Sequence, residues 1–260
     1  MKLDYDIEIN ILKDIHDLDS KECLIISDKE CSENYYTVVK IIDDILGEKY
    51  LKKWTDNTKS QFPPDFINEE DSLIMEVMRI DNHSVDGKIN PNLAKQREMI
   101  KEIEKIRDVF PGAERIITNA VTDLPTNEDH NYVNYYTSFQ RTIRKHLSKL
   151  KKYKNNYPNK KVIFLVADET SGIYFEAITK TDFISYGRPH LVFQDKRFVS
   201  EFINSELDYL LFYSPYNYFE TIEEHLQLPQ LIVFDVKHMK DNKDFTIIDY
   251  DETRMISNEK

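Results

Sequence analysis

One segment constrains the fold more than any other: a long amphipathic helix pattern followed at once by a short apolar run. From Tyr132 onward, apolar residues recur at intervals of three and four, which predicts a helix that ends before Asn155. Residues 161–168 (KVIFLVAD) then form a continuous apolar run, typical of a central strand covered on both faces. A helix followed by a buried strand predicts an α/β protein with a mixed central sheet flanked by helices.

Weaker patterns extend this framework along the chain. A double proline and a polar turn separate two apolar runs at 61–67 and 73–80, which predicts a β-hairpin whose second strand is buried. No internal repeat or linker is visible, so we expect a single domain over residues 1–260, with a frayed tail at 257–260. Apolar spacing and turn residues predict further strands at 23–27, 115–121, 207–213 and 231–236, and helices at 32–47, 92–110 and 220–226.

Composition excludes several classes of function. The 35 basic and 47 acidic side chains give a net charge of −12, so any phosphate group must be bound by a local basic patch or a metal ion. The five glycines are widely spaced, which excludes the glycine-rich phosphate loops of dinucleotide-binding proteins, P-loop NTPases and kinases. Cys23 and Cys31 lack the spacing of a zinc site and are expected to be reduced thiols, with a disulfide as the alternative. With neither a signal peptide nor a membrane span in the sequence, we expect a cytoplasmic protein.

Two carboxylates in the predicted hairpin form the main candidate site. Asp65 and Glu76 lie on adjacent arms of the hairpin, where side-chain alternation can direct both to one point. Paired carboxylates in a half-buried site repel one another unless a cation neutralises them, and a divalent metal is a suitable cation. The alternative is that Glu76 faces solvent on an edge strand or pairs with a lysine or arginine.

The sequence Pro64-Asp65, followed by Glu76 in an apolar strand, resembles the PD-(D/E)XK nuclease superfamily. The resemblance implies a restriction-endonuclease-like core over about residues 32–168, with a C-terminal α/β extension over about 169–256. It further implies that Asp65, Glu76 and the main-chain carbonyl of Val77 hold Mg²⁺ or Mn²⁺, which activates water for attack on a phosphodiester of DNA or RNA.

The third motif of that family is degenerate here, because Met78 stands where the family has a lysine. A thioether cannot stabilise developing phosphorane charge, and Arg79 points to the opposite face of the strand. An active enzyme must therefore take a cation or proton donor from elsewhere, and His146 and Lys149 of the following helix are the candidates by angular position, beside Tyr153. A core histidine and a snorkelling lysine would explain the same positions without catalysis. The alternative function is a non-catalytic binding or regulatory protein that retains the fold.

The same helix carries a local basic cluster in an otherwise acidic chain. Its members include Arg144, Lys145 and Lys152, which are candidates for binding a nucleic-acid backbone. A solvated helix face is the alternative interpretation of these residues.

Two further acidic positions match site patterns less well. Asp235 and Lys237 complete a D-x-K at the end of a predicted strand, but too little chain follows to close a nuclease core, so we expect an exposed strand end. Asp168, at the end of the central strand, is either an additional metal ligand or a turn-forming acid.

Overall fold

The computed structural model describes residues 3–16, 18, 23–26, 53–57, 64–81, 105, 131–170, 172–178, 187–215, 229–241 and 247–257. Several predicted elements lie outside these ranges. They are the helices at 32–47 and 220–226, the strand at 115–121, and the helix at 92–110 except for Lys105.

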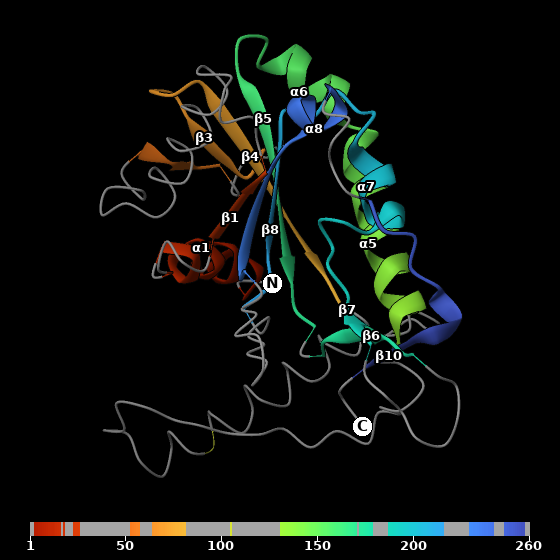
Figure 1. Cartoon of the computed structure of the whole chain (residues 1–260). Helices are drawn as coiled ribbons and strands as arrows, with labels where there is room; N and C mark the ends of the chain where they lie inside the picture. The colour runs from red at the N-terminus through yellow and green to blue at the C-terminus, as the bar shows by residue number, and fades with distance from the viewer. Residues whose placement is uncertain are drawn as a thin grey trace.

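A mixed sheet of seven strands forms the centre of the described part of the chain, in the order β1-β9-β8-β5-β4-β3-β2 (Figure 1). The β4–β5, β5–β8 and β1–β9 pairs are parallel, and the β2–β3, β3–β4 and β8–β9 pairs are antiparallel. The strands are β1 (Cys23–Ile26), β2 (Thr55–Asp56), β3 (Phe66–Asn68), β4 (Leu73–Ile80), β5 (Lys161–Asp168), β8 (Tyr209–Tyr213) and β9 (Leu231–Asp235).

Helices cover both faces of this sheet, as the sequence predicts. In Figure 1, α1 lies on one side of the sheet, whereas the other helices lie on the opposite side. The helices are α1 (Leu3–His16), α5 (Tyr132–Leu147), α6 (Leu150–Asn156), α7 (Lys196–Phe202) and α8 (Val236–Asp241). Strand β5 is buried along almost its whole length, which confirms it as a central strand.

A second, three-stranded sheet packs at the end of the molecule where β5 finishes (Figure 1). Its order is β10-β6-β7, with both pairs antiparallel. Its strands are β6 (Tyr174–Glu176), β7 (Arg188–Pro189) and β10 (Met255–Ser257), and a short 3-10 helix, η2 (Glu252–Arg254), precedes β10. Ser257 therefore belongs to a strand, and the predicted tail begins too early.

The predicted hairpin is confirmed as β3 and β4, and the side chains of β4 alternate between the two layers. Ile74 and Met78 pack in the core beneath α5, α6 and α7, whereas Met75 and Val77 pack in the core beneath α1. Glu76 lies between these positions and shares the face of Ile74 and Met78. The hairpin thus carries Glu76 beneath the helices that follow it in the chain.

The long helix predicted from Tyr132 is interrupted between α5 and α6, which corrects that prediction. The Ser148 hydroxyl donates to the carbonyl of Lys145 at 2.7 Å, and Lys149 N–H donates to the carbonyl of His146 at 3.0 Å. These bonds tighten one turn of the helix. No glycine or proline lies in this turn, so the residue pattern did not indicate that the helix is interrupted there. His146 and Tyr153 lie on either side of this junction.

Candidate functional site

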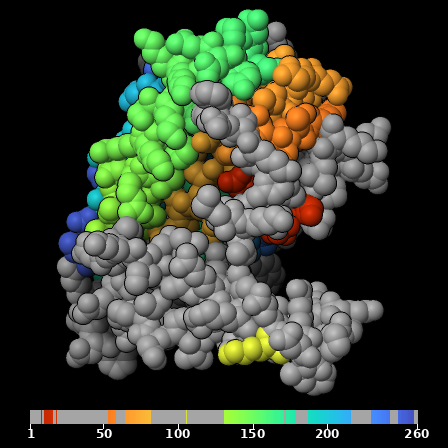
Figure 2. Space-filling view, turned by 180° about the vertical axis from the view of Figure 1, so that it is seen from behind, coloured from red at the N-terminus to blue at the C-terminus, as the bar shows by residue number. Residues whose placement is uncertain are grey.

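The structure brings the carboxylate pair together where the hairpin and the α5–α6 junction meet. Phe66 is paired with Met75, which places Asp65 opposite Glu76 on the antiparallel arms. Figure 2 views the molecule from the side on which the hairpin (orange) and the two helices (green) meet. We call Asp65, Glu76, His146, Lys149 and Tyr153 the carboxylate site.

Glu76 is buried, with 6 % of its surface exposed, so the alternative that it faces solvent is wrong. Within the described ranges, the basic side chain in contact with Glu76 is a histidine rather than a lysine or arginine, since His146 Nδ1 lies 3.1 Å from Glu76 Oε1. Within the described part of the chain, Glu76 Oε2 has no hydrogen-bond partner. Burying a carboxylate oxygen without a hydrogen-bond donor costs free energy, so this oxygen of Glu76 lowers the stability of the fold.

Asp65 is half-buried, and one of its oxygens is held by the backbone. Val77 N–H donates to Asp65 Oδ2 at 2.7 Å, which fixes the side chain across the hairpin. Burial raises the pKa of Asp65 to about 8, with further increases from the Glu76 and Glu8 carboxylates. The Val77 N–H and the Lys149 ammonium oppose this rise, so Lys149 acts electrostatically on the pair.

Aromatic packing positions the two side chains that the helices contribute. The rings of His146 and Tyr153 each meet Phe164 edge-on, with centroids 6.2 Å apart in both cases. Phe164 is the β5 residue in register with Glu76. The helix junction therefore brings both rings over the same point of the sheet, and the predicted proximity of His146, Lys149 and Tyr153 to the carboxylates is confirmed.

Met78 is buried in the core beneath α5, with 4 % of its surface exposed. Arg79 faces away and forms an ion pair with Glu169, so it supplies no cation to the site. Among the described residues, Lys149 is the lysine that acts electrostatically on the carboxylate pair.

The residues present suit a hard divalent cation. Two facing carboxylates with an unsatisfied buried oxygen offer the oxygen ligands that Mg²⁺ and Mn²⁺ prefer. No group of three or more His, Cys, Asp or Glu side chains in the described ranges is arranged to hold a metal. A bound ion would therefore need further ligands from backbone, water or substrate, as is usual for Mg²⁺. Asp65 and Glu76 would hold it, and a role for the Val77 carbonyl stays a prediction.

Glu8 of α1 is a neighbour of the site that the sequence analysis missed. Its carboxylate is near enough to raise the pKa of Asp65. A signal was present, because Ile7, Ile11 and Ile15 recur every four residues, a spacing typical of an amphipathic helix.

The basic candidates on α5 and α6 differ in their surroundings. Arg144 forms two hydrogen bonds with Glu201 of α7, at 2.7 and 3.1 Å, so its guanidinium is engaged within the protein, and its assignment as a nucleic-acid contact stays a prediction. Lys145 and Lys152 are exposed. The nucleic-acid interface predicted for this helix stays a prediction.

Neither of the two weaker acidic candidates reaches the carboxylate site. Asp168 accepts hydrogen bonds from Thr170 N–H, the Tyr135 hydroxyl and the Ser214 hydroxyl, which supports the turn-forming alternative. Burial raises its pKa to about 6, with these bonds opposing the rise. Asp235 has 2 % of its surface exposed and accepts a bond from His238 N–H at 3.0 Å, so the expected exposure is wrong for Asp235, whereas Lys237 is exposed. Strand β9 ends at Asp235 and α8 begins at Val236, so the predicted strand ends one residue too late.

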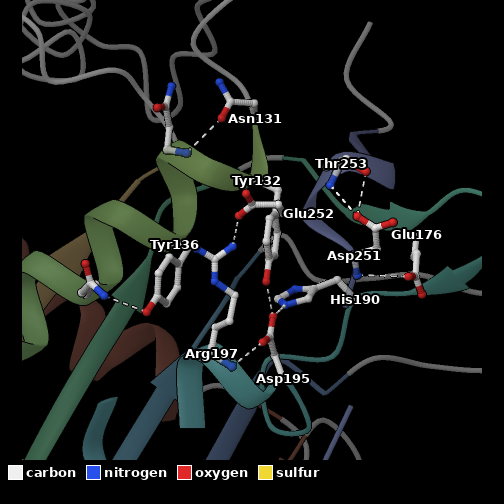
Figure 3. Close-up of polar contacts among 12 residues, drawn as sticks. Asn131, Tyr132, Tyr136, Glu176, His190, Asp195, Arg197, Asp251, Glu252 and Thr253 are labelled. Carbon is white, nitrogen blue, oxygen red and sulfur yellow. Dashed lines mark hydrogen bonds and ion pairs between the residues drawn. The ribbon is translucent and has the colours of Figure 1, made fainter. Parts of the chain in front are cut away.

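A second buried polar cluster lies beside the small sheet, around Asp195 (Figure 3). Asp195 Oδ2 contacts His190 Nε2 at 2.6 Å and accepts a bond from the Tyr132 hydroxyl, while Oδ1 accepts from Arg197 N–H at 2.8 Å. Burial alone would raise the pKa of Asp195, but the bonds from His190 and Tyr132 outweigh it and lower the pKa. We call these four residues the Asp195 network.

Sequence reasoning gave no indication of the Asp195 network. Its members come from α5, from the chain after β7 and from the start of α7, and no local spacing connects them. No protein-family model, curated protein or solved structure matches the chain. None of the described helices is long and apolar enough to cross a membrane.

Proposed function

We propose that this protein is a metal-dependent nuclease-like hydrolase that cleaves phosphodiester bonds of DNA or RNA at the carboxylate site. The observation that carries the proposal is the facing pair Asp65 and Glu76, in which a buried Glu76 oxygen lacks a hydrogen-bond partner among the described residues. Such a pair is stable when a cation lies between the charges. A divalent ion, when bound, supplies Lewis-acid activation of the phosphodiester and of water.

The order and pairing of the strands also support the resemblance to the PD-(D/E)XK superfamily. Strands β2, β3 and β4 form an antiparallel meander, after which α5 and α6 lead to β5, parallel to β4. This arrangement places the Pro-Asp segment and the Glu76 strand side by side, with the next helices above them. We therefore propose a restriction-endonuclease-like core, extended by β8 and β9 at the free side of β5.

The protein's own groups have separable roles in this proposal. Asp65 and Glu76 bind the cation, with the Val77 N–H fixing the orientation of Asp65. His146, 3.1 Å from Glu76, is placed to exchange a proton with that carboxylate or with substrate. Lys149 supplies positive charge near Asp65, where an incoming phosphate would add negative charge.

One observation favours the alternative, a non-catalytic binding protein that retains this fold. Met78 occupies the lysine position of the resembled motif and packs in the hydrophobic core rather than facing a ligand. An inactive descendant would keep the metal pair and lose turnover. Binding and cleavage must therefore be measured separately.

Mn²⁺ titration of thermal unfolding tests the metal site. A ligand that binds only the folded state stabilises it by about 2.7 kcal/mol at a hundredfold excess over Kd, so Mn²⁺ is expected to raise the Tm of the wild type. The isosteric variants Asp65→Asn and Glu76→Gln are expected to lose that shift. Glu70→Gln, at the exposed hairpin turn, is the matched control and should retain it.

Cleavage of labelled single- and double-stranded DNA and RNA with Mn²⁺ decides between enzyme and binding protein. Cleavage that disappears in Glu76→Gln supports the hydrolase. A Tm shift that needs Asp65 and Glu76 but is accompanied by no cleavage supports the alternative. An identical shift in Asp65→Asn would overturn the metal site itself.

A further inference from the structure

A pocket lies at the carboxyl ends of β5 and β8, beside the Asp195 network. It measures about 310 Å³, including its open mouth, which suits a small ligand. Because β5 and β8 are parallel, their carboxyl ends meet at the same edge of the sheet, where ligands of open α/β sheets commonly bind. Asp168 lies four residues beyond Phe164, the partner of Glu76, and is thus about 13 Å along the strand from the carboxylate site. The polar residues among the described lining are Tyr135, Asp168, Thr170, Tyr174 and His190.

Asp168 contributes a buried negative charge to this pocket, with 3 % of its surface exposed. The Tyr135 and Ser214 hydroxyls and the Thr170 N–H donate hydrogen bonds to it at 2.8, 3.2 and 3.0 Å, so its orientation is fixed. These donors are neutral, and burial still raises the pKa of Asp168 to about 6. No lysine or arginine is among the described residues that line the pocket. A bound cation would therefore lower the free energy of the ionised carboxylate.

His190 contributes a nitrogen acceptor to the same pocket. The residue is 8 % exposed, and its Nε2 lies 2.6 Å from Asp195 Oδ2, which the Tyr132 hydroxyl also contacts (Figure 3). Since Asp195 accepts the hydrogen on Nε2, the neutral ring keeps a lone pair on Nδ1. Among the described residues Nδ1 has no hydrogen-bond partner, and it is not enclosed by the protein. Nδ1 is therefore the ring nitrogen that borders the pocket.

The chemistry of the lining favours a positively charged hydrogen-bond donor. An ammonium group carries three N–H donors and the charge that would neutralise Asp168. The described lining also includes the aromatic rings of Tyr135, Tyr174 and Phe212, and aromatic rings attract cations. An anion would instead be repelled by Asp168, and the net charge of −12 on the whole chain favours cations further. The small volume restricts the ligand to a small amine.

We propose that this pocket binds the ammonium group of a small primary amine, which donates hydrogen bonds to the Asp168 carboxylate and to His190 Nδ1. Asp195 is then a positioning residue, because its contact with Nε2 directs Nδ1 to the pocket, and the Tyr132 hydroxyl in turn holds Asp195. The Asp195 network thereby gains a role in binding as well as in stability. The amine site shares no residue with the carboxylate site, so it is independent of the function proposed above.

Titration of the wild type with ethylammonium, followed by nitrogen NMR of the histidine rings, tests the proposal. At about pH 8, above the ordinary histidine pKa of about 6.5, we expect the free protein to show His190 with a proton on Nε2 and none on Nδ1. Ethylammonium should shift the Nδ1 resonance saturably, with a Kd of about 1 mM at best for a ligand of so few atoms. Propionate, an anion of similar size, and tetramethylammonium, a cation without N–H donors, should not reproduce this shift.

Asp168→Asn should weaken ethylammonium binding by roughly tenfold or more, the scale of a lost hydrogen bond to a charged group. Asp249→Asn, at an exposed aspartate, is the matched control and should bind as the wild type does. If Asp168→Asn does not fold, the wild-type titration decides alone, because it requires no variant.

Four results would overturn the amine site. They are the absence of a saturable Nδ1 shift with ethylammonium, an equal shift with propionate or tetramethylammonium, a proton on both ring nitrogens of His190 at about pH 8, and unchanged affinity in folded Asp168→Asn. None of these measurements depends on Mn²⁺ or on cleavage, so failure of the carboxylate site would leave the amine site standing.

Discussion

The carboxylate site and the Asp195 network each contain a buried carboxylate, but the two carboxylates differ in the hydrogen-bond donors that they receive. Asp195 has three donors and a pKa below its ordinary value, so its charge is stabilised within the fold. Asp65 has a pKa raised to about 8, and its neighbour Glu76 has an oxygen with no donor among the described residues. A carboxylate that has hydrogen-bond donors stabilises the fold. A carboxylate pair that lacks a donor does not, and carboxylates with such perturbed pKa values are typical of functional sites.

The largest expected effect comes from matched amide substitutions in the two regions. Asp195→Asn leaves the His190 and Tyr132 donors facing an amide and should lower the free energy of unfolding by about 3–5 kcal/mol. Glu76→Gln removes a charge that opposes ionisation of Asp65 and breaks no hydrogen bond to Oε2 from the described residues, so stability should be unchanged or higher. Urea unfolding in metal-free buffer measures both.

If Asp195→Asn fails to fold, Tyr132→Phe provides a milder test of the same network. It removes one hydroxyl donor and should cost about 1 kcal/mol. Equal losses in Glu76→Gln and Asp195→Asn would break the comparison, because both carboxylates would then be structural.

The pH dependence of stability should have opposite signs in the two regions. Because the Asp65 pKa rises from 3.8 to about 8 on folding, its contribution is present below pH 3.8 and is lost as the pH rises through 8, by at most about 1.4 kcal/mol per pH unit. The contribution of Asp195 is present above the unfolded pKa and is lost as the pH falls through the lowered folded pKa.

Urea unfolding of metal-free protein between pH 2 and pH 9 measures both slopes, because the Asp195 slope lies below pH 3.8. Asp65→Asn should remove the decline seen in the wild type towards high pH and be the more stable protein at pH 9. A decline that persists in Asp65→Asn would assign it to another group, such as Asp168, whose pKa is raised to about 6.

The smallest expected effect concerns the basic residues of α5, where one side chain is paired within the protein and its neighbour is not. Arg144 is bound to Glu201, whereas the ammonium of exposed Lys145 makes no ion pair within the described residues. If nucleic acid binds here, Lys145→Gln should reduce the slope of log binding constant against log salt by about 0.7–0.9. Arg144→Gln should leave that slope unchanged in the same fluorescence anisotropy titration, and a larger loss in Arg144→Gln would contradict the distinction.

Local pattern predicted the parts of this fold that local chemistry determines. The hairpin and the central strand followed from proline placement and from an apolar run, and Asp65 and Glu76 came together because strand alternation and register are short-range rules. The proximity of His146 and Tyr153 followed from helical angle, and survived the break at Ser148 because one tightened turn displaces the next residues only slightly.

Long-range partners were beyond the reach of such patterns. Asp195 receives the Tyr132 hydroxyl from a residue 63 positions away, and Arg144 meets Glu201 at a separation of 57. Nothing in the spacing of these residues encodes which helix will pack against α5. The approach of Glu8 to Asp65 likewise depends on α1 docking to the sheet.

The pairing of β1 with β9 has a consequence for how the chain reaches this fold. Cys23 lies opposite Leu231, so the first strand of the sheet finds its partner only when the last one is available. During synthesis β1 must wait for its partner strand until β9 (Leu231–Asp235) has emerged. A ribosome-bound chain that stops before β9 would have both β1 and one side of β8 open to other strands. Nascent molecules of this protein are therefore exposed to strand-mediated association from the synthesis of β1 until that of β9.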